Sequence, residues 1–172
     1  MKRFVIATML SVLLAAPAVA ASADSPARNN SIGVNYGLDE DGVVGIQGEF
    51  DISASMPDKP PVSVQVFWKN YSHSFSNNVG TYQYNYNGFG VAAIYDFSST
   101  ARLDKRFKPY AGLGLIALNS DLSGPNSQPP QSAETGGLYI TLGVQYALTP
   151  TLSADLSFNN IGGLTIGANI NF

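Results

Sequence analysis

The stretch Leu164-Thr165-Ile166-Gly167-Ala168-Asn169-Ile170-Asn171-Phe172 alternates strictly between apolar and small or polar side chains. Successive side chains of a β-strand point to opposite faces, whereas those of a helix repeat every 3.6 residues. A period of two over nine residues therefore predicts a strand with one apolar face, which carries Leu164, Ile166, Ala168, Ile170 and Phe172.

The same alternation recurs along the rest of the chain. It is clearest over 152–159 and 138–149, and the turn residues of 149–150 and 159–163 predict that these three strands form an antiparallel meander. Five further stretches complete a set of eight strands: 32–38, 44–52, 62–69, 88–97 and 107–118.

One segment departs from this pattern. Tyr82, Tyr84 and Tyr86 stand in the opposite phase to the apolar residues of 88–97. Either a β-bulge near Asn87-Gly88 or a strand that extends beyond a membrane would produce such a shift, and the sequence leaves both explanations open.

The composition is unusual for a water-soluble domain. Charged residues make up 12% of the 172 residues, about half the usual share of about 25%. No apolar run after the N-terminal segment approaches the ~18 residues that a membrane helix needs. Only helices and closed barrels satisfy every backbone polar group in lipid. The chain is therefore predicted to be all-β, an eight-stranded antiparallel up-and-down transmembrane β-barrel.

The N-terminal segment has the features of a secretory signal. Lys2 and Arg3 precede an apolar run over 4–16, and Ala18-Val19-Ala20 offers a cleavage site, with 21–23 as a second candidate. We expect residues 1–23 to be a cleaved signal peptide and 24–172 to be the barrel domain. Removing Lys2 and Arg3 leaves seven of nine basic residues against twelve acidic ones, a net charge of −5, which argues against nucleic-acid binding.

The residues on the polar face of the strands indicate whether that face lines the barrel interior or contacts bulk water. It carries Ser, Thr, Asn, Gln and Gly with few charges, which suits the crowded interior of an eight-stranded barrel better than a solvated surface. We therefore expect the apolar face to contact lipid. A soluble periplasmic lipocalin-like carrier, with the apolar face inward, is the alternative. A polar network in the lumen is expected to include Glu49, Asp51, Gln65, Lys69, Gln145 and Asp155.

Strand order predicts where the connections lie. With a periplasmic N-terminus, we expect cell-surface loops at 39–42, 70–79, 119–135 and 159–163, and periplasmic turns at 54–61 and 98–106. A basic run in the second turn, solvated or close to lipid headgroups, consists of Arg102, Lys105, Arg106 and Lys108.

The sequence offers no strong catalytic or metal motif. His73 and Ser76 come nearest to the His and Ser of the lipid A deacylases, but residues three apart on a strand point to opposite faces, and both fall in a predicted loop. With one histidine and no cysteine, a zinc site is not expected. Asp39-Glu40-Asp41 is interpreted as a solvated turn, with cation binding as the alternative. We predict no catalytic residue, cofactor or metal.

Two stretches resemble known outer-membrane proteins. Thr165, Gly167, Ile170 and Phe172 match the C-terminal assembly signal of outer-membrane barrels, and this resemblance implies recognition by the barrel-assembly machinery. The stretch 107–115 is similar to a strand opening of small barrels of the OmpX, OmpW and opacity-protein type. Fold and function are separable, so the resemblance does not fix an activity.

These observations favour a non-enzymatic protein of the bacterial outer membrane, with a structural or surface-interaction role through its extracellular loops. A narrow channel for ions or small polar solutes is the alternative within the same fold. The expected partners are outer-membrane lipids and lipopolysaccharide, with the barrel-assembly machinery during biogenesis and no nucleic acid. The protein is expected to be a monomer.

Overall fold

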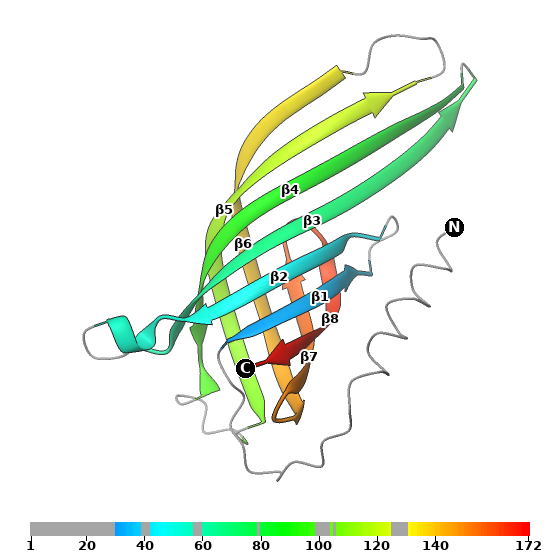
Figure 1. The fold of residues 1–172 in the computed structure, drawn as a ribbon. Coiled ribbons are helices and arrows are strands. Elements are labelled where there is room, and N and C mark those ends of the chain that lie inside the picture. The colour runs from blue at the N-terminus through cyan, green and yellow to red at the C-terminus, as the bar shows by residue number, and fades with distance from the viewer. Residues whose placement is uncertain are drawn as a thin grey trace.

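Eight antiparallel strands close into one barrel (Figure 1). The computed structural model describes residues 30–38, 42–56, 60–78, 80–98, 104, 106–124 and 131–172. The strands are β1 Ser31–Gly37, β2 Val44–Asp51, β3 Val62–Asn77, β4 Gly80–Asp96, β5 Phe107–Ser123, β6 Gln131–Thr149, β7 Leu152–Asn159 and β8 Gly163–Asn171. A 3-10 turn, Ser53–Ser55, follows β2. The predicted eight-stranded up-and-down barrel is confirmed.

Each strand pairs with its neighbours in sequence, and β1 pairs with β8 to close the sheet. Within the described ranges, no helix has both the length and the apolar character needed to cross a bilayer. The predicted signal peptide, residues 1–23, lies outside the described residues.

The barrel turns its apolar side chains outward. Leu115 is 66% exposed and Leu142 62%, whereas Ser153 is fully buried and Thr165 is 1% exposed. Large exposed apolar side chains occur on every strand of the barrel, among them Ile32, Ile46, Val66, Phe89, Leu113, Ile140, Leu156 and Ile170. This orientation is the one that the sequence predicts for a lipid-facing barrel, and it is opposite to that of a soluble barrel with an apolar core.

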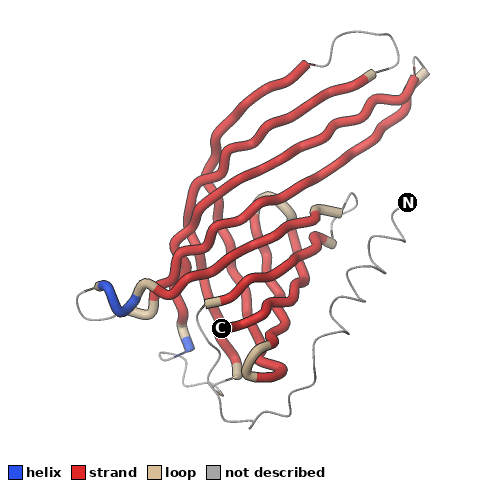
Figure 2. Tube along the Cα trace, in the orientation of Figure 1, coloured by secondary structure: helices blue, strands red, loops and turns tan. Residues whose placement is uncertain are grey.

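The strands are of two lengths. The four central strands, β3 to β6, have 16 to 19 residues, whereas β1, β2, β7 and β8 have 7 to 9. Because a tilted strand of ~9–11 residues spans a bilayer, the central strands continue well past it. They stand above the short strands as a curved wall at one end of the barrel, here called the β3–β6 wall (Figures 1 and 2).

Two of the predicted loops are therefore wrong in large part. The range 70–79 belongs mostly to β3, which runs to Asn77, and the range 119–135 includes the end of β5 and the start of β6. Polar residues replace apolar ones on the outer face in both ranges, and the sequence interpretation took this change for the end of the strand. A strand in water has no reason to keep an apolar outer face.

The change from lipid to water along β4 also explains why Tyr82, Tyr84 and Tyr86 alternate out of phase with the apolar residues of 88–97. Pairing of β3 with β4 is continuous from Val62↔Tyr95 to Asn77↔Gly80, so no bulge interrupts β4 near Asn87-Gly88. Tyr82, Tyr84 and Tyr86 continue the inward row of β4, whose members nearer the membrane are Gly88, Gly90, Ala92 and Ile94. Of the two explanations that the sequence left open, strand extension is correct.

We expect a charge on the outer face of β5 to be tolerated above the membrane and not within it. Leu113→Arg places a guanidinium in the apolar band and should destabilise the barrel by about 2–4 kcal/mol. Asn119→Arg changes the same face of the same strand, six residues further along, and should cost less than about 0.5 kcal/mol. Urea unfolding of the refolded proteins in lipid vesicles measures both.

Equal costs for the two arginine variants would show that Asn119 also contacts lipid. The boundary between membrane and wall on β5 would then be misplaced.

Candidate functional site

A charged network lies inside the barrel. Lys108 Nζ and a Glu49 carboxylate oxygen are 2.5 Å apart, and both side chains are almost fully buried. The same carboxylate accepts hydrogen bonds from Ser63 Oγ at 2.5 Å and from Gln145 Nε2 at 3.1 Å. A buried carboxylate is tolerated only when it is paired and hydrogen-bonded, and Glu49 meets both conditions.

A second part of this network involves the other two buried charges. The Tyr110 hydroxyl donates to Asp155 at 2.9 Å, and Lys69 Nζ donates to Asn159 Oδ1 at 2.9 Å. Lys69 also lies over the ring of Tyr139, 5.4 Å from its centroid. Two acids and two bases thus share the described part of the interior.

Amides form the third part of the network. Asn35 Nδ2 donates to Gln47 Oε1 at 2.9 Å, and Gln47 Nε2 donates to Asn169 Oδ1 at 3.0 Å. Gln65 Nε2 donates to Gln47 Oε1 at 3.3 Å. These bonds link β1, β2, β3 and β8 across the seam where the barrel closes.

Five of the six residues expected in the lumen are buried there: Glu49, Gln65, Lys69, Gln145 and Asp155. The sixth does not join them. Asp51 is exposed at the end of β2, where its carboxylate accepts a hydrogen bond from the Ser53 backbone N–H at 2.8 Å.

Lys108 is the buried charge that sequence reasoning missed, and Gln47, Asn159 and Tyr110 are among the uncharged members of the network that it also did not expect. Lys108 was assigned to the basic run of a periplasmic turn, yet it is 3% exposed and lies in β5. The available signal was its phase, since Lys108 alternates with outward residues in step with Tyr110 and Gly112.

The rest of that basic run is at the surface where it is described. Arg106 and Asp104 form an exposed ion pair at 3.1 Å. Hydrogen bonds from Arg106 lower the pKa of the Asp104 carboxyl, as expected when a neighbouring cation favours the charged form. Arg102 and Lys105 lie outside the described residues.

Apolar side chains fill the part of the interior next to the long strands. Phe67, Ala92, Ile94, Tyr110, Ile116 and Tyr139 form one buried cluster. The rings of Phe67 and Tyr139 are 4.2 Å apart between centroids, and Phe67 packs against Gly90, where a Cβ would collide with its ring. An eight-stranded barrel has room for little more than such side chains.

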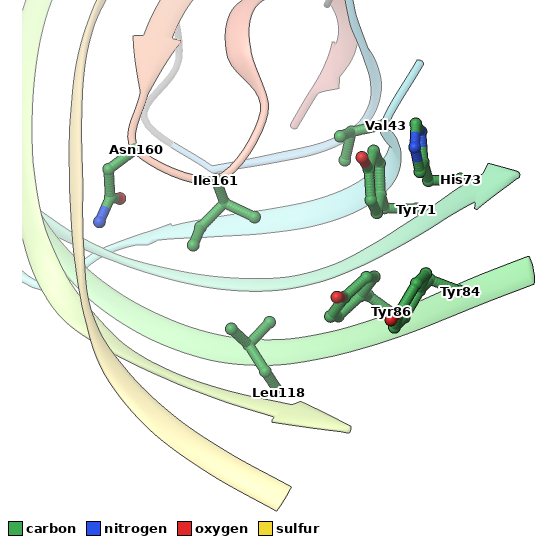
Figure 3. A pocket seen from close by; sticks show the side chains of 8 residues that line it. All are labelled: Val43, Tyr71, His73, Tyr84, Tyr86, Leu118, Asn160 and Ile161. Carbon is green, nitrogen blue, oxygen red and sulfur yellow. The ribbon is translucent and has the colours of Figure 1, made fainter. Parts of the chain in front are cut away.

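A cleft opens above this apolar cluster, at the end of the barrel from which the β3–β6 wall extends (Figure 3). Its volume is about 550 Å³. The residues that line it are Val43, Tyr71, His73, Tyr84, Tyr86, Leu118, Asn160 and Ile161. They come from the wall on one side and from the β1–β2 and β7–β8 connections on the other, so the cleft exists only because the barrel is closed.

Aromatic rings dominate the wall side of the cleft. Tyr71 and Tyr86 are register partners on β3 and β4, with ring centroids 5.4 Å apart. Tyr84 stacks on Tyr86 at 6.2 Å, and His73 lies parallel to Tyr71 at 6.4 Å. The four rings thus form two short rows on neighbouring strands, and Figure 3 shows them gathered at one side of the cavity.

His73 and Ser76 do not come together. His73 lines the cleft, and the Ser76 hydroxyl is 2.9 Å from that of Thr81 on the opposite face of the β3–β4 hairpin. Both residues lie in β3 and not in a loop as expected. Among the described residues, no group of three or more His, Asp or Glu side chains is placed to hold a metal ion. Asp39-Glu40-Asp41 lies outside the described part of the chain.

The four residues of the resembled assembly signal divide between the two faces of the C-terminal strand. Thr165 is buried against Ser157, their hydroxyl oxygens 2.6 Å apart, and a Cβ on Gly167 would lie 2.9 Å from the Val34 carbonyl oxygen. Ile170 is 60% exposed and Phe172 51% exposed. Recognition of these residues by the assembly machinery stays a prediction.

Comparison with known proteins points in one direction. The family model described as "Outer membrane protein beta-barrel domain" matches residues 7–171, and no curated protein matches the chain. The N-terminal barrel of Pseudomonas aeruginosa OprF is similar in fold, at 18% identity and a TM-score of 0.59, covering 84% of this chain and 98% of that one.

Two further solved structures share the fold. Neisserial surface protein A has 19% identity and a TM-score of 0.58, covering 83% of this chain and 94% of that one. Ail, the attachment invasion locus protein of Yersinia pestis, solved with the heparin analogue sucrose octasulfate, has 14% identity and a TM-score of 0.50, covering 85% and 95%. At these identities the likeness shows the fold alone.

The ion pair inside the barrel predicts strongly non-additive stability effects. Lys108→Met should lower the free energy of unfolding by about 3–5 kcal/mol, because Glu49 is left as an uncompensated buried charge. Adding Glu49→Gln to that variant should restore most of the loss. Urea titration of the refolded barrel measures the three free energies, and equal losses in the single and double variants would contradict the pairing.

Proposed function

Because the chain belongs to the outer membrane protein beta-barrel domain family, we propose that it is a non-enzymatic outer-membrane protein that acts through contacts at the cell surface. One observation carries this proposal: four strands continue beyond the bilayer as an ordered wall instead of ending in loops. Counted from the bilayer, the β3–β4 and β5–β6 hairpins are longer than the connections 52–61 and 97–106 at the other end of the barrel. Outer-membrane barrels carry their longer excursions outside the cell, which supports an extracellular wall.

A wall outside the membrane is expected to have a polar outer face in contact with water, and the two faces of the wall differ accordingly. Its outer face is polar, with Ser72, Ser74, Ser76, Thr81, Gln83, Asn85, Asn119, Asp121, Ser123 and Glu134. Hydrogen bonds between strands, such as Gln83 Nε2 to Ser72 Oγ at 3.2 Å, cross this face. The inner face carries the tyrosines. A wall of paired strands is already ordered before any partner arrives, which lowers the entropic cost of binding.

The filled interior argues against the channel alternative. The Glu49–Lys108 pair and the cluster around Phe67 occupy the lumen, and opening a water path would break a buried, hydrogen-bonded ion pair. The carrier alternative needs an apolar interior and a polar exterior in contact with water. The outward Leu, Ile and Val side chains argue against it.

An adhesive or protective role fits the geometry better than catalysis does. The separation of His73 from Ser76 on opposite faces of β3 removes the one candidate nucleophile–base pair of the sequence. Among the proteins of similar fold, Ail carries the name attachment invasion locus protein. That name describes Ail, and it shows only that this fold is compatible with surface attachment.

We expect the purified barrel to be electrically silent. In planar bilayers it should give no conductance steps above the baseline, because side chains fill the lumen. Stepwise conductance that persists after the wall has been shortened would favour the channel alternative.

Shortening the wall should abolish surface contacts and leave assembly intact. In one variant, Asn-Gly turns replace residues 72–85 and 120–133, so that the register partners Tyr71 and Tyr86, and Asn119 and Glu134, flank tight hairpins. Attachment of a Gram-negative host that expresses either form is measured on bare plastic, on mucin and on an epithelial monolayer. The full chain should raise attachment several-fold on at least one surface.

The control for this experiment is heat-dependent gel mobility, which reports whether each barrel is folded in the outer membrane. Equal attachment by folded long and short barrels would show that the wall is not the interacting part.

A further inference from the structure

We propose that the cleft at the mouth of the barrel binds an uncharged sugar unit of an extracellular glycan. This inference rests on the proposed function, because the cleft must face the outside of the cell. It assigns a ligand class to one place on the wall, namely the inner face around Tyr71, Tyr84 and Tyr86.

The size and construction of the cleft suit a small ligand. Its volume of about 550 Å³ lies within the range of about 300–1,000 Å³ that is usual for ligand sites. Its far side is held in place, because Asn160 Nδ2 donates to the Leu138 carbonyl at 2.7 Å and Asn160 Oδ1 accepts from Ile140 N–H at 3.0 Å. These bonds tie the β7–β8 turn to β6, so Ile161 is positioned before a ligand enters.

The chemistry of the lining matches that of a sugar ring. A sugar presents faces of C–H groups and a rim of hydroxyls, and a tyrosine presents an apolar ring and one hydroxyl. Three tyrosines and His73 supply aromatic surface and polar tips, while Val43, Leu118 and Ile161 supply aliphatic surface. The tyrosines and His73 are only partly buried, so part of each ring is available to a ligand.

The charge around the cleft argues for an uncharged ligand. No Lys, Arg, Asp or Glu is among the described residues that line it. Lys69 lies beneath, 4% exposed and bonded to Asn159. The charges of the described part of the wall, Asp121 and Glu134, alternate with the inward residues and face outward. A polyanion such as a sulfated sugar would find no exposed cation in this lining to pair with.

An alkyl chain is a poorer occupant than a sugar. It would remove water from phenol hydroxyls and an imidazole and would offer them no hydrogen bond in return, which costs free energy. A saccharide can replace the hydrogen bonds to water that are lost on binding, because each of its hydroxyls both donates and accepts.

The test uses the full barrel refolded in lipid nanodiscs and a panel of neutral oligosaccharides of hexose and N-acetylhexosamine. Binding is found by saturation-transfer NMR and its affinity is measured by calorimetry. Tyr84→Ala combined with Tyr86→Ala should weaken binding at least tenfold. The matched control, Gln83→Ala combined with Asn85→Ala, changes the outer face of the same strand and should leave affinity within twofold.

A finer variant separates ring from hydroxyl. Tyr84→Phe keeps the aromatic surface and should weaken binding less than the double alanine variant does. All of these positions lie above the lipid-facing band, and heat-dependent gel mobility verifies that each variant is folded.

Several results would overturn the inference. They are the absence of any neutral saccharide that distinguishes the full barrel from the double tyrosine variant, binding restricted to sulfated sugars, and displacement by alkyl detergents alone. Binding only to lipopolysaccharide in vesicles, with no response to free oligosaccharides, would exclude an extracellular glycan as the source.

The attachment experiment separates this inference from the proposed function. If the long wall promotes attachment but no neutral sugar binds, only the ligand class is wrong. If long and short barrels attach equally, the surface role itself fails.

Discussion

The pairing of β1 with β8 is the contact on which the rest of the structure depends. It runs from Ser31↔Asn171 to Gly37↔Thr165 and leaves no open strand edge at the level of the short strands, where the barrel is closed. Backbone N–H and C=O groups in lipid have no water to bond, so an open edge would cost several kcal/mol for each unpaired group. Once the sheet is closed, every side chain of the barrel must point either to lipid or into a narrow interior.

That interior is divided between two kinds of packing. The long strands contribute the apolar cluster of Phe67, Ile94 and Ile116, and the polar network joins β2 and the short strands of the seam to β5 and β6. Burying the Glu49–Lys108 pair is expensive unless every partner is in place, and Ser63 and Gln145 complete the set. Loss of either member of the ion pair would leave an uncompensated buried charge, so the described lumen is occupied by its own side chains, and the proposed ligand site lies above the mouth.

Sequence periodicity predicted the strands correctly where their outer face contacts lipid. Within the bilayer the outer face must be apolar, so alternation predicted eight strands, their orientation and five lumen residues. It failed at 70–79 and 119–135, because above the bilayer the outer face becomes polar while the strand continues. Lys108 was missed because its positive charge suggested a solvated turn, although its place in the alternation is that of an inward residue. Asp51 has the phase of a lumen residue, but the short β2 ends there and leaves it exposed.

The unequal strand lengths explain why a cleft exists at all. In the barrel, an inward side chain of β3 or β4 meets side chains from strands on the opposite side, and the interior is filled. Above the mouth the opposite strands have ended, and among the described residues Val43, Asn160 and Ile161 line the cleft across from the wall. The inward row of Tyr86 and Tyr84 continues beyond the end of the neighbouring short strand β2, whose pairing with β3 stops at Val44↔Asn70. The inner face of the wall is small and partly polar, since each tyrosine adds a hydroxyl to its apolar ring. Those are also the properties that make it a binding site.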